Sequence, residues 1–359
     1  PIYQVSTFRQ ESLDAKQDYI YSRSGNPTRE ALENYIAELE GVRHGFAFAS
    51  GMAAISACMS LLEAGDHLVL TEGLYGGTYR VLTRVFERFG LEYSFADTGR
   101  PKAVRDAIRR ETAAVFVETP ANPTMRITDL DATSDVAHEH DALLMVDNTF
   151  MSPWLQRPIQ SGADIVIHSA TKFLGGHSDL VAGLVTVGDS TIASNLNTIQ
   201  GATGGILGPF DSWLLMRGMK TLGVRMDRCQ QNAGEIARWL QTVEAVQEVL
   251  YPGFGSLGNS KSHAFQADGP GAIISFRLRH GYSGQHLAES TSVWSLAVSL
   301  GGVESIITVP ARMTHVPYPQ EELQRLGITG KLVRLSVGIE DVRDLIEDLK
   351  GAFEGLHAG

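Results

Sequence analysis

Cysteine is scarce in this chain, which has 359 residues but only two cysteines, Cys58 and Cys229. Neither belongs to a CxxC pair or has histidines at metal-ligand spacing, so the sequence predicts no disulfide framework and no metal site. Both cysteines fall in helical-looking segments and are expected to be reduced.

Long hydrophobic runs are absent as well. No apolar stretch approaches the roughly 20 residues that a membrane-spanning helix needs, so no membrane partner is expected. The chain opens at Pro1 without a methionine or a signal-like segment, which leaves open whether residues precede it. The cytoplasm is the expected compartment.

Basic residues are fewer than acidic ones. Lysine and arginine total 30 against 41 aspartate and glutamate residues, and the formal charge is −11. Nucleic-acid binding needs clustered positive charge at the phosphates, so this balance argues against a nucleic-acid partner. Hydrophobic residues make up 43% of the chain and charged residues 20%, as in an ordinary globular protein with small-molecule partners.

Short apolar runs alternate with amphipathic segments over residues 29–188, which predicts an α/β fold with a mostly parallel, seven-stranded sheet covered on both faces. The predicted strands are 44–50, 67–71, 93–97, 113–119, 143–147, 164–169 and 184–187. The predicted helices between them are 29–40, 52–63, 78–88, 102–110 and 130–140. Several of the strands are apolar throughout, as expected when both faces of a sheet are buried.

The pattern changes after about residue 209. A long helical stretch, 212–249, precedes a segment rich in Gly, Ser and Pro at 251–271. Strand-like runs return at 272–278 and 333–337, before a final helix from Asp341. These features predict a smaller α+β domain. The expected parts are an N-terminal arm (1–28), an α/β domain (29–215) and the C-terminal α+β domain (216–359).

Polar residues follow three of the predicted strands, at the sheet edge where ligands of α/β proteins bind. Ser50-Gly51-Met52 opens a helix whose free N–H groups attract an anion, the alternative being a plain N-cap. Asp147 ends an apolar strand, where a buried carboxylate needs a positive partner; a helix cap or a structural salt bridge is the alternative. Lys172 follows the next strand, where a desolvated amine is suited to Schiff-base chemistry.

Motifs along essentially the whole chain resemble the Cys/Met-metabolism family of pyridoxal-5′-phosphate (PLP) enzymes, the trans-sulfuration enzymes of fold type I. In chain order they are YSRSGNPTR (21–29), SGMAA (50–54), LYGGT (74–78), ETPANP (118–123), VDNT (146–149), SATK (169–172), SLGG (299–302) and RLSVG (334–338). The resemblance implies an aspartate-aminotransferase-like fold, PLP as the cofactor and small sulfur amino acids as substrates.

The resemblance also implies roles for individual residues. Lys172 is expected to hold PLP as a Schiff base and to move protons, and Asp147 to pair with the ring nitrogen. Tyr75 is expected to stack on the ring and to act as an acid or base on the leaving group. The remaining cofactor-binding residues are Gly51, Met52, Ser169 and Thr171 at the phosphate, Asn122 at the ring hydroxyl oxygen, and Glu118 in the same motif.

Substrate binding is implied at a second set of residues. Arg334 is expected to bind the substrate carboxylate with two guanidinium nitrogens, next to Ser299 and Asn122. Tyr21 and Arg23, in the N-terminal arm, are expected to reach the PLP phosphate of a neighbouring subunit. This implies a homo-oligomer that is a dimer at least, and in the usual form a tetramer of two dimers.

The residues that separate the reactions of the family are mixed. Val298 stands where many γ-lyases and cystathionine γ-synthases carry Glu, so a charged anchor for the distal amino group of cystathionine is lacking there. Methionine γ-lyases resemble the chain at Val298, but Gly77 stands where they carry Cys. Arg80 resembles the cystathionine-handling members. Val298 and Arg80 are both expected to line the substrate site.

The expected activity is γ-elimination from cystathionine, which gives cysteine, 2-oxobutyrate and ammonia, with side activity on cysteine or homocysteine. The alternatives within the family are cystathionine β-lyase, methionine γ-lyase, and cystathionine γ-synthase or O-acylhomoserine sulfhydrylase. A non-catalytic PLP-fold binding protein is the alternative of another class. The intact set of Lys172, Asp147, Tyr75 and Arg334 argues against it.

Overall fold

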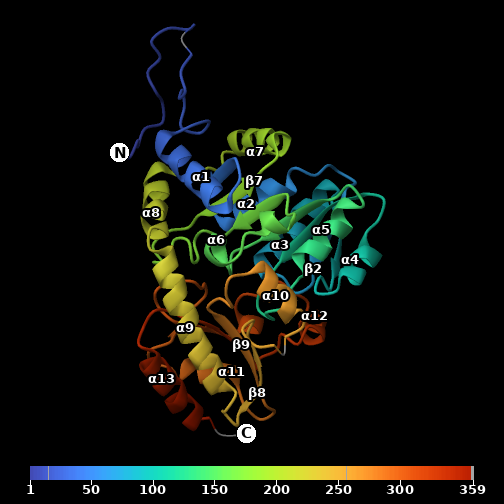
Figure 1. Cartoon of the computed structure of the whole chain (residues 1–359), viewed down its shortest axis with the longest axis vertical. Coiled ribbons are helices and arrows are strands. Elements are labelled where there is room, and N and C mark those ends of the chain that lie inside the picture. The colour runs from blue at the N-terminus through green and yellow to red at the C-terminus, as the bar shows by residue number, and fades with distance from the viewer. Residues whose placement is uncertain (15, 256, 357–359) are drawn as a thin grey trace.

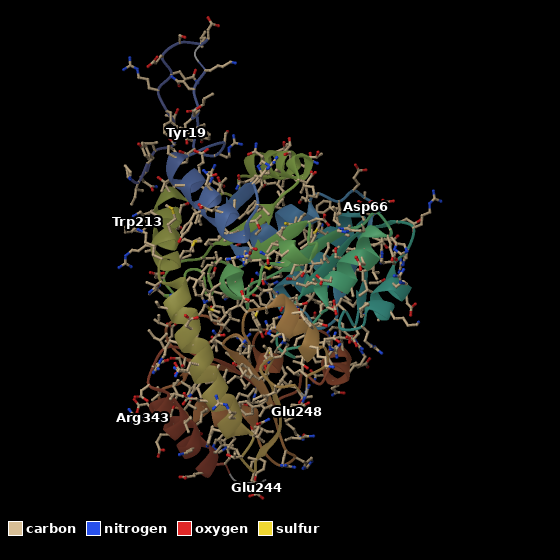
Figure 2. All side chains as sticks on the ribbon, viewed as in Figure 1. Tyr19, Asp66, Trp213, Glu244, Glu248 and Arg343 are labelled. Carbon is tan, nitrogen blue, oxygen red and sulfur yellow. The ribbon has the colours of Figure 1, made fainter. Side chains whose placement is uncertain are left out.

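The computed structural model describes residues 1–14, 16–255 and 257–356. An α/β body is built on a seven-stranded sheet, a smaller C-terminal part on a five-stranded sheet, and an N-terminal arm projects away from the body (Figure 1). Tyr19 of the arm and Glu244 of the C-terminal part lie toward opposite ends of the molecule (Figure 2).

The large sheet confirms the predicted α/β fold. Its strands are β1 (His44–Phe48), β2 (His67–Thr71), β3 (Glu92–Ala96), β4 (Thr112–Glu118), β5 (Leu143–Asp147), β6 (Ile165–His168) and β7 (Gly183–Val187). Their order across the sheet is β1-β7-β6-β5-β4-β2-β3. Strand β7 runs antiparallel to β1 and β6, and the pairs from β6 to β3 are parallel. The predicted strand ends differ from the observed ones by at most two residues.

Helices cover both faces of this sheet. They are α1 (Pro27–Glu40), α2 (Gly51–Met59), α3 (Gly76–Arg84), α4 (Pro101–Ala107), α5 (Leu130–His138), α6 (Ser152–Leu155) and α7 (Ser190–Thr203), with short 3₁₀ turns at Phe86–Phe89 and Pro158–Ser161. Phe116 and Met145 are buried with residues of α2 and α3, whereas Val117 and Val146 are buried with residues of α4 and α5. The central strands read as continuous apolar runs because both of their faces are covered.

The C-terminal part forms a second sheet and its own core. Its helices are α8 (Pro209–Met219), α9 (Leu222–Leu240), α10 (Ser260–Gln266), α11 (Gly284–Glu289), α12 (Gln320–Arg325) and α13 (Val342–Glu354), with a 3₁₀ turn at Pro310–Arg312. Its strands are β8 (Val246–Leu250), β9 (Ile273–Leu278), β10 (Ser295–Leu296), β11 (Ile306–Thr308) and β12 (Leu332–Ser336). They lie in the order β10-β11-β12-β9-β8. Residues of α9, α13 and the inner strands, among them Phe276 of β9, make one buried cluster, which also includes Trp294 just before β10.

The prediction of one helix over 212–249 is wrong beyond Leu240. Residues 246–250 form β8, which pairs with β9, and the helical stretch before it is divided into α8 and α9. The register of β8 shifts between Val246 and Glu248, so its apolar residues do not alternate and instead match helical spacing. Helices α7 and α10 were not predicted. The division into three parts stays a prediction, and its boundary at 215 falls within α8.

The N-terminal arm folds back on itself before it meets the body. Thr7 and Tyr21 form an antiparallel bridge, with Phe8 donating from its backbone nitrogen to the Ile20 carbonyl at 2.9 Å. The arm ends at Asn26, whose side chain caps α1 by accepting hydrogen bonds from two backbone nitrogens of the first turn. Capping of this kind fixes where the helix begins.

Cys58 and Cys229 are buried free thiols. Within the described ranges, no helix combines the length and apolar composition that would let it cross a membrane. In the same ranges, no three side chains of His, Cys, Asp or Glu gather as a metal site would require.

Candidate active site

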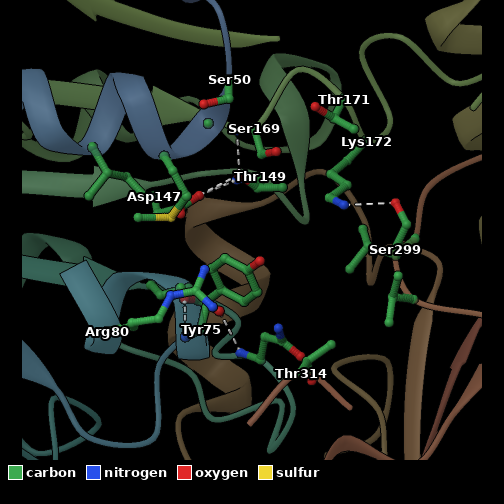
Figure 3. A pocket seen from close by; sticks show the side chains of 18 of the residues that line it. Ser50, Tyr75, Arg80, Asp147, Thr149, Ser169, Thr171, Lys172, Ser299 and Thr314 are labelled. Atoms are coloured by element: carbon green, nitrogen blue, oxygen red, sulfur yellow. Dashed lines mark hydrogen bonds between the residues drawn. The ribbon is translucent and has the colours of Figure 1, made fainter. Parts of the chain in front are cut away.

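A cavity of about 680 Å³ opens at the carboxyl ends of β4, β5 and β6, where loops of the C-terminal part meet the large sheet. Every predicted site residue except Tyr21 and Arg23 lines it (Figure 3). These are Gly51, Met52, Tyr75, Arg80, Glu118, Asn122, Asp147, Ser169, Thr171, Lys172, Val298, Ser299 and Arg334. Residues from distant parts of the sequence therefore meet in one cavity, as the motifs predicted.

The start of α2 has both a side-chain N-cap and free backbone N–H groups, the two features considered from the sequence. Ser50 is a true N-cap, because its hydroxyl accepts a hydrogen bond of 3.0 Å from the backbone nitrogen of Ala53. The backbone N–H groups of Gly51 and Met52 belong to the first turn, so they have no partner within the helix. A Cβ atom on Gly51 would lie 2.8 Å from the side chain of Ser169. Glycine is needed here because α2 approaches the lysine loop so closely.

Asp147 is held at the end of β5 by the residue two positions later. Its Oδ1 accepts hydrogen bonds from the hydroxyl and, at 3.0 Å, from the backbone nitrogen of Thr149. The Thr149 hydroxyl also accepts from the backbone nitrogen of Ser169 at 2.8 Å. Burial raises the pKa of Asp147, and the hydrogen bonds from Thr149 oppose that shift.

Glu118 ends β4, directly beside Asp147 in the register of the two strands. Its carboxylate accepts from the backbone nitrogens of Tyr75, at 3.0 Å, and Asn122, at 2.7 Å. Burial, followed by the charge of Asp147, raises the pKa of Glu118. Two buried carboxylates thus lie at neighbouring strand ends, where a cation would stabilise both.

Lys172 lies in the loop after β6 and donates a hydrogen bond of 2.7 Å from Nζ to Oγ of Ser299 (Figure 3). Burial, followed by the positive charge of Arg334, lowers the pKa of Lys172 to about 8. The amine is therefore neutral more often at neutral pH than an ordinary lysine, and the neutral amine is the form that acts as a nucleophile or base. We call Glu118, Asp147, Thr149, Ser169 and Lys172 the strand-end group.

Arg334 comes from the middle of β12 and is almost fully buried. It donates from Nη1 to Oδ1 of Asn122 and from Nη2 to the carbonyl of Ser299, both at 2.8 Å. Among the described residues its buried Nε has no hydrogen-bond partner. Burial lowers the pKa of Arg334 to about 10, so the guanidinium stays charged at neutral pH and is able to bind a carboxylate.

Tyr75 occupies the N-cap position of α3, and its ring lies over Gly77 of that helix. A Cβ atom on Gly77 would lie 2.4 Å from the ring of Tyr75 and 2.9 Å from the sulfur of Met52. The observed position of the ring therefore excludes a side chain at residue 77. Arg80, one turn further along α3, is exposed at the rim of the cavity.

The side of the cavity formed by loops of the C-terminal part differs in character. It consists of Val298, Met313, Thr314, Val316 and Pro317, which we call the loop wall. Val298 and Val316 are 63% and 61% exposed. The cavity-lining residues include no carboxylate besides Glu118 and Asp147, so within the described chain the loop wall carries no negative charge.

Three of the predicted phosphate contacts, Thr171, Tyr21 and Arg23, differ from the others in hydrogen bonding or position. Thr171 lines the cavity, but its hydroxyl donates to the Ala182 carbonyl at 3.2 Å and accepts from the Ala182 nitrogen at 3.0 Å. Its donor is therefore already used. Tyr21 and Arg23 lie in the arm, outside the cavity of their own chain, with the Arg23 guanidinium 5.6 Å from the centre of the Tyr21 ring.

Two supporting residues had no predicted role. Thr149, quoted in the VDNT motif, orders both Asp147 and Ser169 as described above. Arg225, on α9, is buried and donates to the carbonyls of Phe173 at 2.7 Å and Gly218 at 3.0 Å. Thr149 has a sequence signal, a hydroxyl just after a strand-ending carboxylate. Arg225 has none, because it lies about 50 positions from the loop that it supports.

Comparison with known proteins gives one consistent result. The family model described as Cys/Met metabolism PLP-dependent enzyme matches residues 1–354. Cystathionine gamma-lyase of Bacillus subtilis (strain 168) is 50% identical over 99% of this chain and 94% of its own length. Cystathionine beta-lyase of Lactococcus lactis subsp. cremoris (strain MG1363) is 48% identical over 99% and 93%. The crystal structure of cystathionine gamma-lyase from Lactobacillus plantarum complexed with L-serine has a TM-score of 0.98 at 44% identity, covering 100% of this chain and 94% of the other.

The cavity suits PLP, the cofactor of that family. Oδ2 of Asp147 accepts no hydrogen bond from the described residues, and a protonated ring nitrogen supplies both the donor and the missing positive charge. The free N–H groups at the start of α2 suit the phosphate. The amine of Lys172, with its lowered pKa, suits the aldehyde. These donors and acceptors match the three ends of the cofactor.

Proposed function

Because the chain belongs to the Cys/Met-metabolism PLP-dependent enzymes, we propose that it is a carbon–sulfur lyase of trans-sulfuration that favours γ-elimination from L-cystathionine. The products are cysteine, 2-oxobutyrate and ammonia, and cysteine and homocysteine are side substrates. A γ-lyase and a β-lyase are both among its relatives at about half identity. They support the substrate class, and the site geometry supports the lyase reaction.

One contact carries this proposal. The amine of Lys172 is hydrogen-bonded to the hydroxyl of Ser299, and the carbonyl of that same serine accepts from Arg334. The base is thereby tied to the group that binds the substrate carboxylate. An amino acid bound by its carboxylate at Arg334 therefore presents its Cα and Cβ protons to Lys172, which is the arrangement that successive proton transfers require.

The other residues act around that base. PLP, when bound, withdraws electrons from Cα of the amino acid and so makes its proton acidic. Asp147 holds the ring nitrogen protonated, and the N–H groups of Gly51 and Met52, with Ser169, bind the phosphate. Tyr75 covers the ring and delivers a proton to the departing sulfur. Glu118 fixes the backbone of both Tyr75 and Asn122.

The regiochemistry depends on the other end of the substrate. Arg80, at the rim of the cavity, is suited to the distal carboxylate of cystathionine, whereas the loop wall offers no carboxylate to the distal amino group. A weakly held distal end permits more than one placement of the C–S bond. The exposed, uncharged Val298 thus favours a second candidate, the cystathionine β-lyase reaction, which gives homocysteine, pyruvate and ammonia.

Among the family alternatives, methionine γ-lyase is less well supported. Methionine γ-lyases carry Cys at residue 77, where the ring of Tyr75 leaves no space for a Cβ atom. A γ-synthase or sulfhydrylase uses an O-acylhomoserine, and it would be recognised by thiol consumption without release of a keto acid. A non-catalytic protein would have no need for an amine with a lowered pKa near Arg334, whose Nε has no hydrogen-bond partner among the described residues.

The active form is proposed to be a homo-oligomer in the cytoplasm, a dimer of dimers. Tyr21 and Arg23 lie too far from the cavity of their own chain to line it, and the arm that carries them projects from the body (Figure 1). Each arm would then bring both residues to the phosphate site of a neighbouring subunit.

The decisive measurement is incubation of the purified enzyme with L-cystathionine, followed by identification of the keto acid and the thiol. 2-Oxobutyrate with cysteine is the expected result. Pyruvate with homocysteine would transfer the proposal to the β-lyase reaction. Absence of any keto acid from cystathionine, cysteine and homocysteine would refute the lyase proposal as a whole.

A further inference from the structure

A fully buried histidine, His315, lies behind the cavity and takes no part in the chemistry described above. Its Nε2 lies 3.1 Å from the carbonyl oxygen of Asn122 and its Nδ1 lies 2.9 Å from the hydroxyl of Thr314. A carbonyl only accepts hydrogen bonds, so Nε2 must carry the proton and Nδ1 accepts from Thr314. Both ring nitrogens are therefore satisfied by a neutral imidazole.

The hydrogen bond to Asn122 completes a chain of contacts that leads to the substrate site. The backbone nitrogen of Asn122 donates to Glu118, its carbonyl accepts from His315, and its side chain accepts from Arg334. Asn122 is thus fixed from both sides of its backbone. Its side chain, in turn, fixes one of the two guanidinium nitrogens with which Arg334 is expected to bind a carboxylate.

The imidazole also belongs to an aromatic stack that reaches α3. His315 stacks on Tyr318 with ring centres 5.6 Å apart, and Tyr318 stacks on Tyr79 at 3.9 Å. The hydroxyl of Tyr318 donates to the carbonyl of Leu74 at 3.0 Å. Leu74 directly precedes Tyr75, so the stack holds the loop that carries the proposed acid. Thr314 adds to this contact, because its carbonyl would lie 2.2 Å from a Cβ atom on Gly76.

We propose that His315 is a positioning residue that keeps the carboxylate-binding Arg334 and the loop of Tyr75 in register with each other. It does so through two connections, one from Nε2 to Asn122 and one through Tyr318 to Leu74. The segment around His315 comes from the C-terminal part, whereas Asn122 and Leu74 follow strands of the large sheet. The contact therefore joins the two halves of the cavity. The inference rests on the roles proposed above for Asn122, Arg334 and Tyr75.

Three variants of His315 separate positioning from mere core packing. In His315→Gln the amide reaches the place of Nε2 and keeps the donor to Asn122. In His315→Asn the amide reaches only the place of Nδ1. His315→Leu fills the space without any donor. Loss of one buried hydrogen bond costs about 1 kcal/mol, which corresponds to a change of about five- to tenfold in an equilibrium constant.

The main readout is the dissociation constant of glycine for the PLP-loaded enzyme, measured from the change in cofactor absorbance. Glycine has a carboxylate but no leaving group, so its binding reports on the Arg334 site without turnover. We expect glycine to bind about tenfold more weakly to His315→Asn and His315→Leu, and within threefold of wild type to His315→Gln. The KM for cystathionine is expected to rise in His315→Asn and His315→Leu and to stay near the wild-type value in His315→Gln.

Tyr318→Phe tests the second connection. It keeps the stacked ring and removes only the hydrogen bond to Leu74, so we expect a several-fold lower kcat with unchanged glycine binding. If His315→Leu and His315→Asn lower the melting temperature but leave glycine binding and KM at wild-type values, the inference is wrong and the histidine only fills the core. If wild type binds glycine but releases no keto acid from cystathionine, the proposed function fails while this inference is still tested by the binding data.

Discussion

The strand-end group and the loop wall face each other across one cavity but are built differently. In the strand-end group, the carboxylates of Glu118 and Asp147 are buried and each is held by at least two hydrogen bonds. In the loop wall, Val298 and Val316 are more than half exposed and apolar. A buried, hydrogen-bonded site fixes the chemistry, whereas an exposed apolar surface is easily altered. We therefore expect the residues that distinguish relatives named as γ-lyase from those named as β-lyase to lie in the loop wall.

The largest effect is expected from removal of the proposed base, Lys172, from the strand-end group. Lys172→Ala is expected to lower keto-acid release from cystathionine on the order of 10³-fold, because a positioned general base contributes about that factor. The absorbance of the protonated Schiff base, roughly at 420 nm, is expected to disappear as well. Lys220→Ala, at an exposed position, is the matched control and should retain both. Substantial turnover by the Lys172 variant would assign the base to another residue.

The second largest loss of activity is expected from substitution of Arg334. Arg334→Gln removes the charged donor that is proposed to bind the carboxylate of the substrate. Hydrogen bonds to charged groups are worth about 1.5 to 3 kcal/mol. We therefore expect KM for cystathionine to rise about 10- to 100-fold, measured by initial rates at saturating PLP. Arg343→Gln, which removes an exposed arginine paired with Asp341, should leave KM unchanged. An unaltered KM in Arg334→Gln would place the carboxylate elsewhere.

The pKa of Lys172 makes the strand-end group sensitive to pH. Burial lowers this pKa from its ordinary value of 10.5 to about 8, so in PLP-free enzyme the rate of Schiff-base formation should rise with pH and level off above about pH 8. A rise that continues to pH 10 would contradict the lowered pKa. The unfolded chain binds more protons between these two values, so Lys172 makes the PLP-free protein more stable as pH rises through this window.

The smallest effect is expected at the loop wall. Val298→Glu adds a carboxylate at an exposed position. An exposed ion pair between this carboxylate and the distal amino group of cystathionine is worth about 0.2 to 1 kcal/mol. The ratio of kcat/KM for cystathionine to that for homocysteine should therefore rise by no more than about fivefold. Val298→Gln, which adds the same bulk without charge, is the control. If Val298→Glu changed kcat/KM for cystathionine more than Arg334→Gln does, the exposed loop wall would contribute more to substrate binding than the buried part of the site.

The sequence was sufficient for the large sheet and most of the strand-end group because both have local signals. Asp147 and Lys172 each follow an apolar run directly or within a few residues, and parallel strands bring such positions to one edge. Strand β8 was assigned to a helix because its register shift leaves apolar residues at helical spacing. Helix α7 was missed although Asp189 caps it and Gly204 ends it, since its residues are mostly polar.

The contacts between the two halves of the cavity were not accessible from the sequence. His315 and Asn122 are 193 positions apart, and Arg225 and Phe173 are 52 positions apart. Neither pair has a local pattern that would reveal its partner. The positions of Arg334 and Ser299 in the cavity were expected only because their motifs resemble a known family. Periodicity alone would have made Arg334 an ordinary residue of a strand.

The register that places the ends of β4, β5 and β6 at one edge of the sheet determines which changes in length the chain tolerates. Glu118 pairs with Asp147, so β4 and β5 end at the same level, and Asp147 pairs with Ile167, so β6 extends one residue further, to His168; neighbouring strands lie about 4.8 Å apart. Insertion or deletion of a single residue inside β5 would turn Asp147 to the opposite face of the sheet. Point substitutions in these strands affect one contact, whereas a change of length displaces the whole row. Variation in length among functional homologues should therefore be confined to the loops, including the segment that forms the loop wall.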